Sequence, residues 1–326
     1  MTTTLVTGAT GLVGNNVVRR LLEEGGKVRV LVRATADPRP LADLPGLEFV
    51  RGDVRDPNAV AGAVRGADRV IHAAAYVRIG WTGWEQARNI NVEGTRNVAQ
   101  AVLAEGARLV HVSSVDALGL GAAGVAADED SAPNGGVLCP YVVTKREAEQ
   151  VVLSLVERGL WATIVNPSFM IGPFDWKPSS GRLLLSVARG WGLFAPLGTN
   201  CYCDARDVAN GILSALERGR PGRRYILCGP MLSYFQAWRI FAEVTGGTPP
   251  VVPIGPIARM GAGRVGDLIG KLTGREPDLN SAATALAAQK RNFSSARAES
   301  ELGYRVRPLR ESASDAWEFF REHAYV

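Results

Sequence analysis

A tyrosine and a lysine four residues apart, Tyr141 and Lys145, are the residues of this sequence best suited to chemistry. Residues i and i+4 of a helix share one face, so the spacing predicts that the phenol and the ammonium group are neighbours. A neighbouring cation favours the phenolate and lowers the pKa of a tyrosine from about 10 toward neutrality. We therefore expect Tyr141 to act as a general acid or base at cellular pH.

A glycine-rich turn, TGATGLVG at residues 7–14, stands between an expected strand at 3–7 and an expected helix at 12–24. Glycines permit a tight turn and a close approach of backbone to a pyrophosphate, and the helix N-terminus supplies N–H donors to the anion. The strand before the turn and the helix after it favour a dinucleotide site over a plain structural turn. The expected binding residues of this turn are Gly8, Thr10, Gly11, Leu12, Val13 and Gly14.

The second expected strand, at 27–33, ends in Arg33, where enzymes that bind NAD place an acidic residue. A guanidinium group suits a 2′-phosphate, so NADP is the preferred cofactor. NAD stays possible if Arg33 is only a surface residue stacked on adenine. Asp53, followed by Val54, falls at the end of the third strand and could accept a hydrogen bond from the adenine amino group. Helix capping is the alternative for Asp53, although Asp56, just before Pro57, is better placed for it.

The first half of the chain alternates short strands with helices, a pattern typical of a doubly wound parallel sheet. The expected strands are 3–7, 27–33, 47–50, 69–72, 108–112 and 161–166, and the expected helices are 12–24, 59–64, 84–105 and 141–158. The fold class is thus α/β, of the Rossmann type.

After residue 166 prolines and aromatic residues break this rhythm. We expect a Rossmann domain at 1–166, to which residues 201–228 return with a helix at 204–218 and a strand at 224–227. The smaller, interleaved and mostly helical substrate region comprises 167–200 and 229–326.

The composition of the 326 residues, 46% hydrophobic and 21% charged with a net charge of +5, is that of an ordinary soluble protein. No signal peptide and no apolar run of spanning length is evident, so a cytoplasmic protein without a membrane partner is expected. The excess arginines are scattered, which makes nucleic-acid binding a weak hypothesis. The spacing of the four cysteines fits neither a zinc site nor a disulfide framework, so no metal is expected.

With these pieces together, the sequence resembles the extended short-chain dehydrogenase/reductase family. The matching motifs are TGATGLVG (7–14), GDV (52–54), HAAA (72–75), NVEGT (91–95), VSSVDALG (112–119), YVVTK (141–145) and NPS (166–168). The chain looks closest to the dihydroflavonol-reductase-like branch, which includes proteins named hopanoid-associated sugar epimerases. Some family members dimerise through the helices expected here at 84–105 and 141–158, so a homodimer is possible.

The resemblance implies a Ser-Tyr-Lys site in which Tyr141 is the general acid/base and Lys145 also holds the nicotinamide ribose. Ser114 would bind the substrate oxygen, since the family's active hydroxyl lies five residues before the glycine of the motif, here Gly119. Ser113 would then make only a backbone contact at the strand end. Asn91 would steady the site through water, or simply cap a helix. The remaining implied cofactor contacts are Ala73, Ala74, Ala75, Val112, Asn166, Pro167 and Ser168, whereas His72 is expected to pack.

The same site serves net reduction of a ketone or aldehyde and redox-neutral sugar chemistry. Nucleotide-sugar enzymes of the family carry a diphosphate-binding arginine where this chain has Asn200, although Arg206 or Arg182 could compensate. The Asp-Glu pair of dehydratases is reduced to Asp116. We therefore favour a reductase, with a nucleotide-sugar epimerase or dehydratase and a non-catalytic cofactor sensor as alternatives. Expected substrate contacts are Tyr76, Asp116, Phe169, Trp176 and Tyr202; each of the aromatic ones could instead be core packing.

Overall fold

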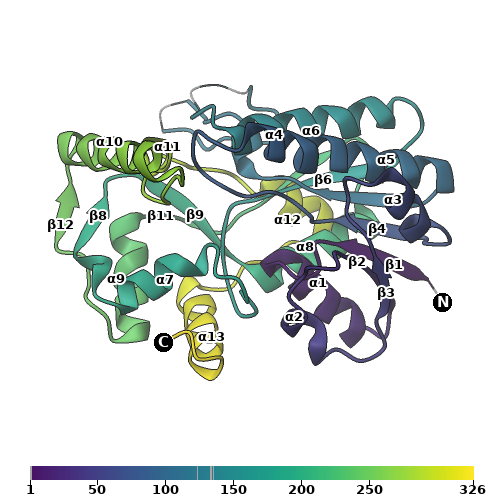
Figure 1. Cartoon of the computed structure of the whole chain (residues 1–326), viewed down its shortest axis with the longest axis horizontal. Helices are drawn as coiled ribbons and strands as arrows, with labels where there is room; N and C mark the ends of the chain where they lie inside the picture. The colour runs from purple at the N-terminus through teal and green to yellow at the C-terminus, as the bar shows by residue number, and fades with distance from the viewer. Residues whose placement is uncertain (1, 123, 133, 135) are drawn as a thin grey trace.

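The computed structural model describes residues 2–122, 124–132, 134 and 136–326. Two layered regions lie side by side: a helix-covered sheet that contains the N-terminus, and a smaller region built from later segments (Figure 1). The C-terminal helix α13, Leu309–Glu322, belongs to the smaller region.

The central sheet has seven parallel strands in the order β10-β6-β5-β4-β1-β2-β3 within the described residues. The order reverses direction at β1, which is the arrangement of a doubly wound nucleotide-binding sheet. The strands are β1 Thr3–Thr7, β2 Lys27–Val32, β3 Glu48–Arg51, β4 Arg69–His72, β5 Arg108–Val112, β6 Trp161–Pro167 and β10 Arg224–Leu227. The prediction of a Rossmann-type α/β fold is confirmed.

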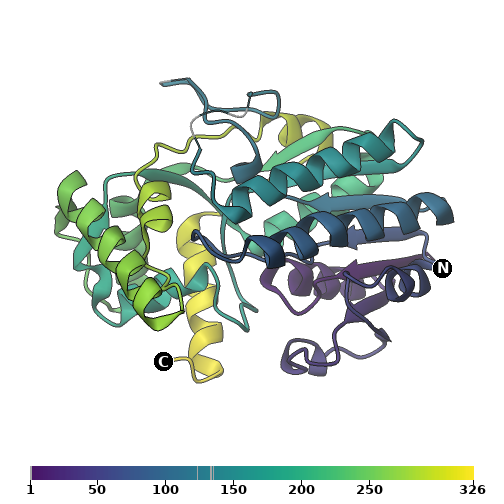
Figure 2. The ribbon, with the colours of Figure 1, turned by 45° about the horizontal axis from the view of Figure 1, so that its top comes forward.

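Helices cover both faces of this sheet, because alternate residues of a buried strand point to opposite sides. Val6 packs into the core beneath α1 Leu12–Glu23 and α8 Ala205–Arg218, whereas Leu5 packs into the core beneath the other helical layer. That layer consists of α3 Pro57–Val64, α5 Gly94–Glu105 and α6 Pro140–Val156, and α5 and α6 run side by side (Figure 2). The shorter α2 Arg39–Ala42 follows β2, and α12 Ala296–Leu302 contacts α8 and β10.

The expected helix at 84–105 is continuous but not uniform. It consists of α4 Trp84–Ala87, a π-helical stretch η1 Arg88–Glu93 and then α5. The period of apolar residues does not distinguish i→i+4 from i→i+5 hydrogen bonding, so this π-helical stretch could not be predicted. Single π-turns inside α-helices are frequent at functional sites.

The smaller region contains a three-stranded sheet, β11-β9-β7, and a two-stranded sheet, β12-β8. Its strands are β7 Phe169–Ile171, β8 Phe194–Pro196, β9 Thr199–Asp204, β11 Met231–Ser233 and β12 Val252–Ile254. Its other helices are α7 Gly181–Ala188, α9 Tyr234–Thr245, α10 Pro256–Thr273 and α11 Ser281–Leu286, with a short 3₁₀ turn at η3 Trp191–Leu193. A second 3₁₀ turn, η2 Val115–Ala117, follows β5 in the main sheet region. The return to the main sheet, expected over 201–228, involves α8 and β10, while residues 201–204 lie in the small sheet.

Candidate functional site

The glycine-rich turn is shaped by two glycines that no other residue could replace without a shift. Gly8 has φ +72°, and a Cβ there would lie 2.5 Å from the backbone nitrogen of Ala74. A Cβ on Gly14 would lie 2.2 Å from the carbonyl oxygen of Gly8. Gly11 is exposed and caps the N-terminus of α1 without any side chain over the free N–H groups. The turn therefore fits a dinucleotide pyrophosphate, which needs bare backbone at a helix N-terminus.

Buried hydrogen bonds brace this turn against β4. His72 Nδ1 lies 2.7 Å from Thr7 Oγ1, and its Nε2 lies 3.1 Å from Thr95 Oγ1. Burial, with a smaller contribution from Lys145, lowers the pKa of His72 to about 3. His72 is therefore a neutral, fully packed residue, as the sequence indicated. Ala73, Ala74 and Ala75 follow it and pass directly under Gly8.

Arg33 follows β2 at the edge where an adenosine ribose would lie, and it is exposed. No ion pair involving Arg33 is present within the described residues. The Asp53 carboxylate is engaged by Arg55 at 2.9 Å, which lowers the pKa of Asp53. Asp56, not Asp53, caps α3, with its carboxylate accepting from the backbone N–H of Asn58 and Ala59. Val54 is buried next to Asp53.

Ser114, Tyr141 and Lys145 come together at the C-terminal end of β5. Ser114 caps η2, its hydroxyl donates to the Asp116 carboxylate at 3.1 Å, and it lies close enough to the Tyr141 hydroxyl to influence the pKa of the tyrosine. Pro140 at the first turn of α6 places Tyr141 and, one turn later, Lys145 on the side that faces the sheet. The Lys145 Nζ donates to the Val112 carbonyl oxygen at 2.8 Å. All three functional side chains are buried.

The pKa of Tyr141 differs from the expectation drawn from its spacing to Lys145. Burial and the nearby Asp116 carboxylate raise it above its usual value, while hydrogen bonding to Ser114 and the charge of Arg291 oppose the rise. Lys145 is not among the main influences on the pKa of Tyr141, and its ammonium donates to the Val112 carbonyl oxygen. Burial lowers the pKa of Lys145 to about 8, against the opposing effect of Glu149. Tyr141 is consequently a phenol at neutral pH, a form that can donate a proton.

Asn91 lies in the π-helical stretch and joins two parts of the site. Its Oδ1 accepts from the backbone N–H of Tyr76 at 2.7 Å, and its Nδ2 donates to the Tyr76 carbonyl at 3.1 Å and to Thr144 Oγ1 at 2.9 Å. Because Thr144 lies between Tyr141 and Lys145, Asn91 fixes the loop after β4 against the helix that carries the tyrosine. The side chain does not cap a helix N-terminus.

Residues at the ends of β5 and β6 hold the serine loop of the site in place by hydrogen bonds. Asn166 donates to the Ser114 carbonyl at 2.9 Å and to Glu149 Oε1 at 2.7 Å, so its amide N–H groups hold the serine loop. The backbone N–H of Ser113 donates to the Val165 carbonyl at 2.8 Å, as a strand-end residue should. Pro167 and Ser168 are buried at the end of β6, and the Ser168 hydroxyl contacts the Cys203 sulfur at 3.4 Å.

The expected substrate residues divide into two groups. Tyr76, Asp116 and Phe169 are half-buried at the edge of the site. Tyr202 is 1% exposed and packs edge-to-face on Phe169 and Phe241. Trp176 packs on Phe319 and His323 of the C-terminal segment. Tyr202 and Trp176 therefore have the contacts of core residues, which is the alternative that the sequence left open for them.

Arg291 is a residue of this site that the sequence analysis missed. It is 8% exposed and forms an ion pair with Asp116. Its positive charge acts to lower the pKa of Tyr141, Tyr202 and Tyr234, against the effect of burial. Its Nε is buried without a hydrogen-bond partner. The segment that carries it passes beside β9, where a parallel bridge joins Thr199 and Lys290. No motif marks Arg291, and only the fold brings it to residue 116.

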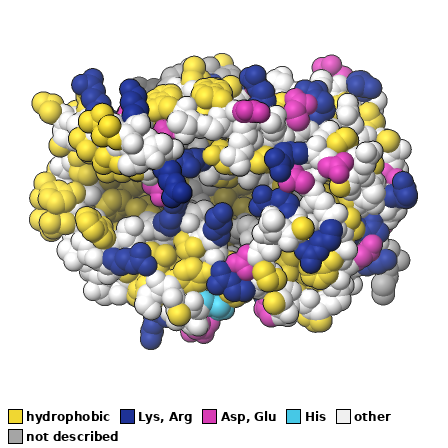
Figure 3. Space-filling view, viewed as in Figure 1, with side chains coloured by type: hydrophobic (Ala, Val, Ile, Leu, Met, Phe, Trp, Pro, Cys, Tyr) yellow, Lys and Arg dark blue, Asp and Glu magenta, His cyan; other side chains and the backbone are white. Residues whose placement is uncertain are grey.

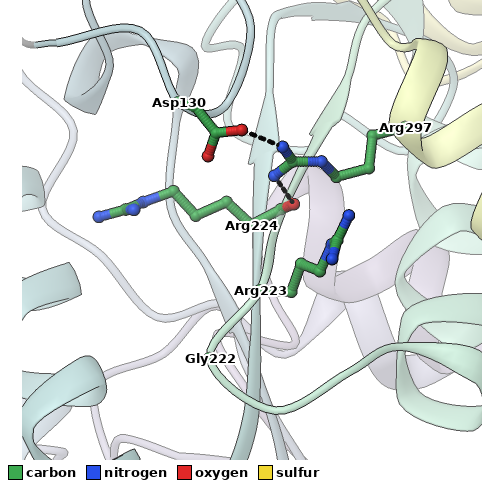
Figure 4. Close-up of a pocket in the computed structure, with 5 residues that line it drawn as sticks. All are labelled: Asp130, Gly222, Arg223, Arg224 and Arg297. Carbon is green, nitrogen blue, oxygen red and sulfur yellow. Dashed lines mark hydrogen bonds and ion pairs between the residues drawn. The ribbon is translucent and has the colours of Figure 1, made fainter.

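Two measurable cavities lie away from these residues. One, of about 210 Å³, is lined by Asp130, Gly222, Arg223, Arg224 and Arg297 (Figure 4). Its arginines are already paired, Arg223 with Glu301, Arg224 with Glu149, and Arg297 with Glu129 and Asp130. The other, of about 300 Å³, lies next to it between η2 and α6. Neither is lined by Ser114, Tyr141 or Lys145. In the second cavity Arg146 donates to the backbone carbonyls of Ala117 and Leu118.

The four cysteines are unpaired and buried. Within the part of the chain that the structure describes, no group of three or more His, Cys, Asp or Glu residues is arranged to hold a metal ion. In the same residues no helix is both long and apolar enough to cross a bilayer.

Comparison with known proteins agrees with this geometry. Residues 4–228 match the NAD dependent epimerase/dehydratase family. Sterol demethylase protein B of Methylococcus capsulatus is 34% identical, over 99% of this chain and 100% of its own. A Synechocystis protein provisionally named dihydroflavonol 4-reductase is 33% identical, over 98% of this chain and 95% of its own. The crystal structure of gox2253 superposes with a TM-score of 0.86 and 37% identity, over 99% of both chains.

The doubly wound sheet, the glycine turn and the Tyr-x-x-x-Lys step define an enzyme of the extended short-chain dehydrogenase/reductase class. The chain belongs to its NAD-dependent epimerase/dehydratase family. The predictions of this family, of its dihydroflavonol-reductase-like branch and of an NAD(P)-dependent oxidoreductase are confirmed.

Proposed function

We propose that this enzyme reduces a ketone or aldehyde on an apolar substrate with NADPH, and that Tyr141 gives the proton. The observation that carries the proposal is the pair of neighbouring hydroxyls, Ser114 and Tyr141, both buried near the end of β5. The Ser114 hydroxyl donates to Asp116 in this structure. Once it rotates toward a bound carbonyl oxygen, it and the Tyr141 hydroxyl can both donate to that oxygen, where negative charge develops during reduction. The raised pKa of Tyr141 keeps its proton in place until that charge appears.

NADPH, when bound, would supply the hydride for the carbonyl carbon. The C=O π electrons then move to oxygen, and that oxygen takes the proton of Tyr141 to give the alcohol. The phenolate left behind recovers a proton from water. Ser114 would position the substrate oxygen next to the Tyr141 hydroxyl. Asn91 holds α6 against the loop after β4 through its hydrogen bonds to Tyr76 and Thr144. The bare glycine turn and the Lys145 ammonium would hold the cofactor.

Reduction is favoured over nucleotide-sugar chemistry because the arginines that could bind a diphosphate are engaged elsewhere. Asn200 is 1% exposed and accepts from the backbone N–H of Cys201. Arg206 is held by Asp204 and Asp315, and Arg182 by Asp278. Arg291 faces the site but is neutralised by Asp116. The name of the Synechocystis relative, a reductase, supports the same direction.

The proposed preference for NADP rests on Arg33, which is exposed beside the expected ribose and without an ion pair in the described part of the chain. Loss of a charge-assisted contact with the 2′-phosphate is worth about 1.5–3 kcal/mol, or at least about tenfold in affinity. Arg33→Ala should therefore weaken NADPH binding by that factor and leave NADH binding unchanged. Arg305→Ala removes another exposed arginine that forms no ion pair within the described residues; this variant is the matched control and should change neither.

The reaction itself is tested by following NADPH oxidation with a panel of apolar ketones and aldehydes, beside UDP- and GDP-sugars. Turnover of a member of the carbonyl panel supports the proposal. Conversion of a nucleotide sugar without net oxidation of the cofactor would contradict it and favour the epimerase alternative. Equal affinity for NADPH and NADH would remove the NADP assignment alone.

A further inference from the structure

Helix α10, Pro256–Thr273, packs in an unusual orientation: its small residues face the protein. Three glycines, Gly263, Gly266 and Gly270, lie against the segment that leads into α11. A Cβ on Gly266 would lie 1.8 Å from the Leu279 carbonyl oxygen, and one on Gly263 would lie 2.5 Å from Thr284 Oγ1. This close approach is possible only because these positions lack side chains.

The bulky apolar residues of the same helix point outward. Ile257 is 87% exposed, Leu272 78%, Val265 57% and Leu268 56%, and Met260 and Ile269 are also exposed. At 100° per residue these positions fall on the side of the helix opposite the three glycines, and we call them the α10 stripe. A helix on the surface of a water-soluble protein normally turns such a stripe toward the core, so this face of α10 is unpartnered.

The stripe continues onto neighbouring elements. β12 leads directly into α10 and pairs with β8, and together with η3 they expose Trp191, Phe194, Leu197, Val251 and Val252. Apolar side chains gather at the end of the molecule formed by these elements (Figures 1 and 3). Figure 2 shows α10 as an outer helix at that end. We call this surface, the α10 stripe with its five neighbours, the α10 face.

The charge around the α10 face is positive. Arg264, Lys271 and Arg275 are exposed and, within the described residues, have no acidic partner. The nearby acids are engaged: Asp267 accepts from the backbone N–H of Ser281, and Glu276 holds the loop at Trp81 and Thr82. Asp278 pairs with Arg182. Exposed apolar residues bordered by unpaired cations match the interface of an anionic bilayer, which offers acyl chains below and phosphates above.

We propose that the α10 face binds the surface of an anionic lipid bilayer, with its apolar stripe inserted among the lipids and Arg264, Lys271 and Arg275 at the headgroups. This differs from the sequence expectation that the protein has no membrane partner, and it does not require a spanning helix. A second copy of the chain is less well suited, because two such faces would bring their unpaired cations together.

The α10 face lies close to the proposed active site. α11 lies between α10 and the site, and its Ala282 packs with Cys139 and Tyr141. Trp81, whose Nε1 donates to Ser281, anchors the same helix to the loop after β4. Bilayer binding through the α10 face would therefore hold the Tyr141 site close to the lipids that could supply an apolar substrate; this last step, unlike the membrane contact, depends on the proposed function.

Vesicle flotation tests the membrane contact without any substrate. The full chain is mixed with vesicles of phosphatidylcholine alone or with added phosphatidylglycerol. We expect flotation with the mixed vesicles, weakened by high salt. Leu268→Glu with Leu272→Glu should reduce binding at least about tenfold, since each charge must enter the interface. Phe49→Glu with Val306→Glu, two exposed apolar residues on other elements, is the matched control and should bind as the parent does.

Unchanged melting temperature and NADPH affinity show that each variant is folded and separate this proposal from the proposed function. Failure of the parent chain to float with phosphatidylglycerol vesicles would overturn the membrane contact. Equal flotation of the two double variants would overturn the assignment to α10. A dimer that dissociates on Leu268→Glu with Leu272→Glu, without vesicle binding, would show that a second copy occupies the face instead.

Discussion

The carboxylate of Asp116, in the turn after β5, accepts from the guanidinium group of Arg291, which lies 175 residues further along the chain. The pair is largely buried and joins the Rossmann region to the C-terminal segment. Asp116 also accepts from the Ser114 hydroxyl at 3.1 Å. One ion pair thus fixes both the serine of the proposed site and the charge next to its tyrosine.

Breaking this pair from either side should destabilise the fold. Arg291→Met leaves the Asp116 carboxylate buried without its partner, so we expect the free energy of unfolding to fall by about 3–5 kcal/mol. Asp116→Asn leaves the Arg291 guanidinium group without its ionic partner, and we expect a somewhat smaller loss. The double variant should lose less than the sum of the two, by about 1–3 kcal/mol. Denaturant unfolding of the parent, the two single variants and the double variant gives the four free energies of unfolding of this double-mutant cycle. Additive losses of stability would show that the two side chains are not energetically coupled.

The same two variants should move the pKa of Tyr141 in opposite directions. The Asp116 carboxylate raises it and the Arg291 charge lowers it. In the alcohol-oxidising direction, which needs the phenolate, the pH profile should therefore shift to lower pH in Asp116→Asn and to higher pH in Arg291→Met. A common shift in both would indicate distortion of the site and not an electrostatic effect.

Binding of NADPH should weaken as the pH rises through about 8, where Lys145 loses its proton. The depressed pKa means that the ammonium is present below this value and absent above it. The decline should disappear in Lys145→Met, which binds weakly at all pH values, and should move well above pH 8 in Lys145→Arg. Fluorescence titration from pH 6 to pH 9.5 measures it; a flat profile for the parent enzyme would exclude Lys145 from cofactor binding.

Gly14→Ala should abolish NADPH binding, because its Cβ would lie 2.2 Å from the Gly8 carbonyl oxygen and displace the turn. We expect a loss of stability of about 1–3 kcal/mol as well. Gly62→Ala is the control, since no atom lies within 4 Å of its Cβ position in α3, and it should stabilise the fold by about 0.5–1 kcal/mol. Tight NADPH binding by Gly14→Ala would contradict the assignment of the turn.

The sheet and the phosphate turn could be predicted because their signals are local. Strand residues such as Val28, Val30 and Val32 alternate in the sequence as they do in the core, and a glycine turn before a helix has few other uses. The Asp116–Arg291 pair could not be predicted, because nothing in the sequence near residue 291 indicates that it reaches β9. The pKa of Tyr141 was misjudged for a related reason: spacing puts Lys145 on its face of α6, but the Val112 carbonyl takes the ammonium.

Single-turnover hydride transfer in Tyr141→Phe, with NADPH and a ketone found in the panel, tests the central claim most directly. Phenylalanine keeps the ring in its buried place and removes only the hydroxyl that faces Ser114. We predict that NADPH binding stays within about twofold while the rate of reduction falls by about 10²–10⁴. Reduction at the parent rate would contradict the role of Tyr141 as the proton donor.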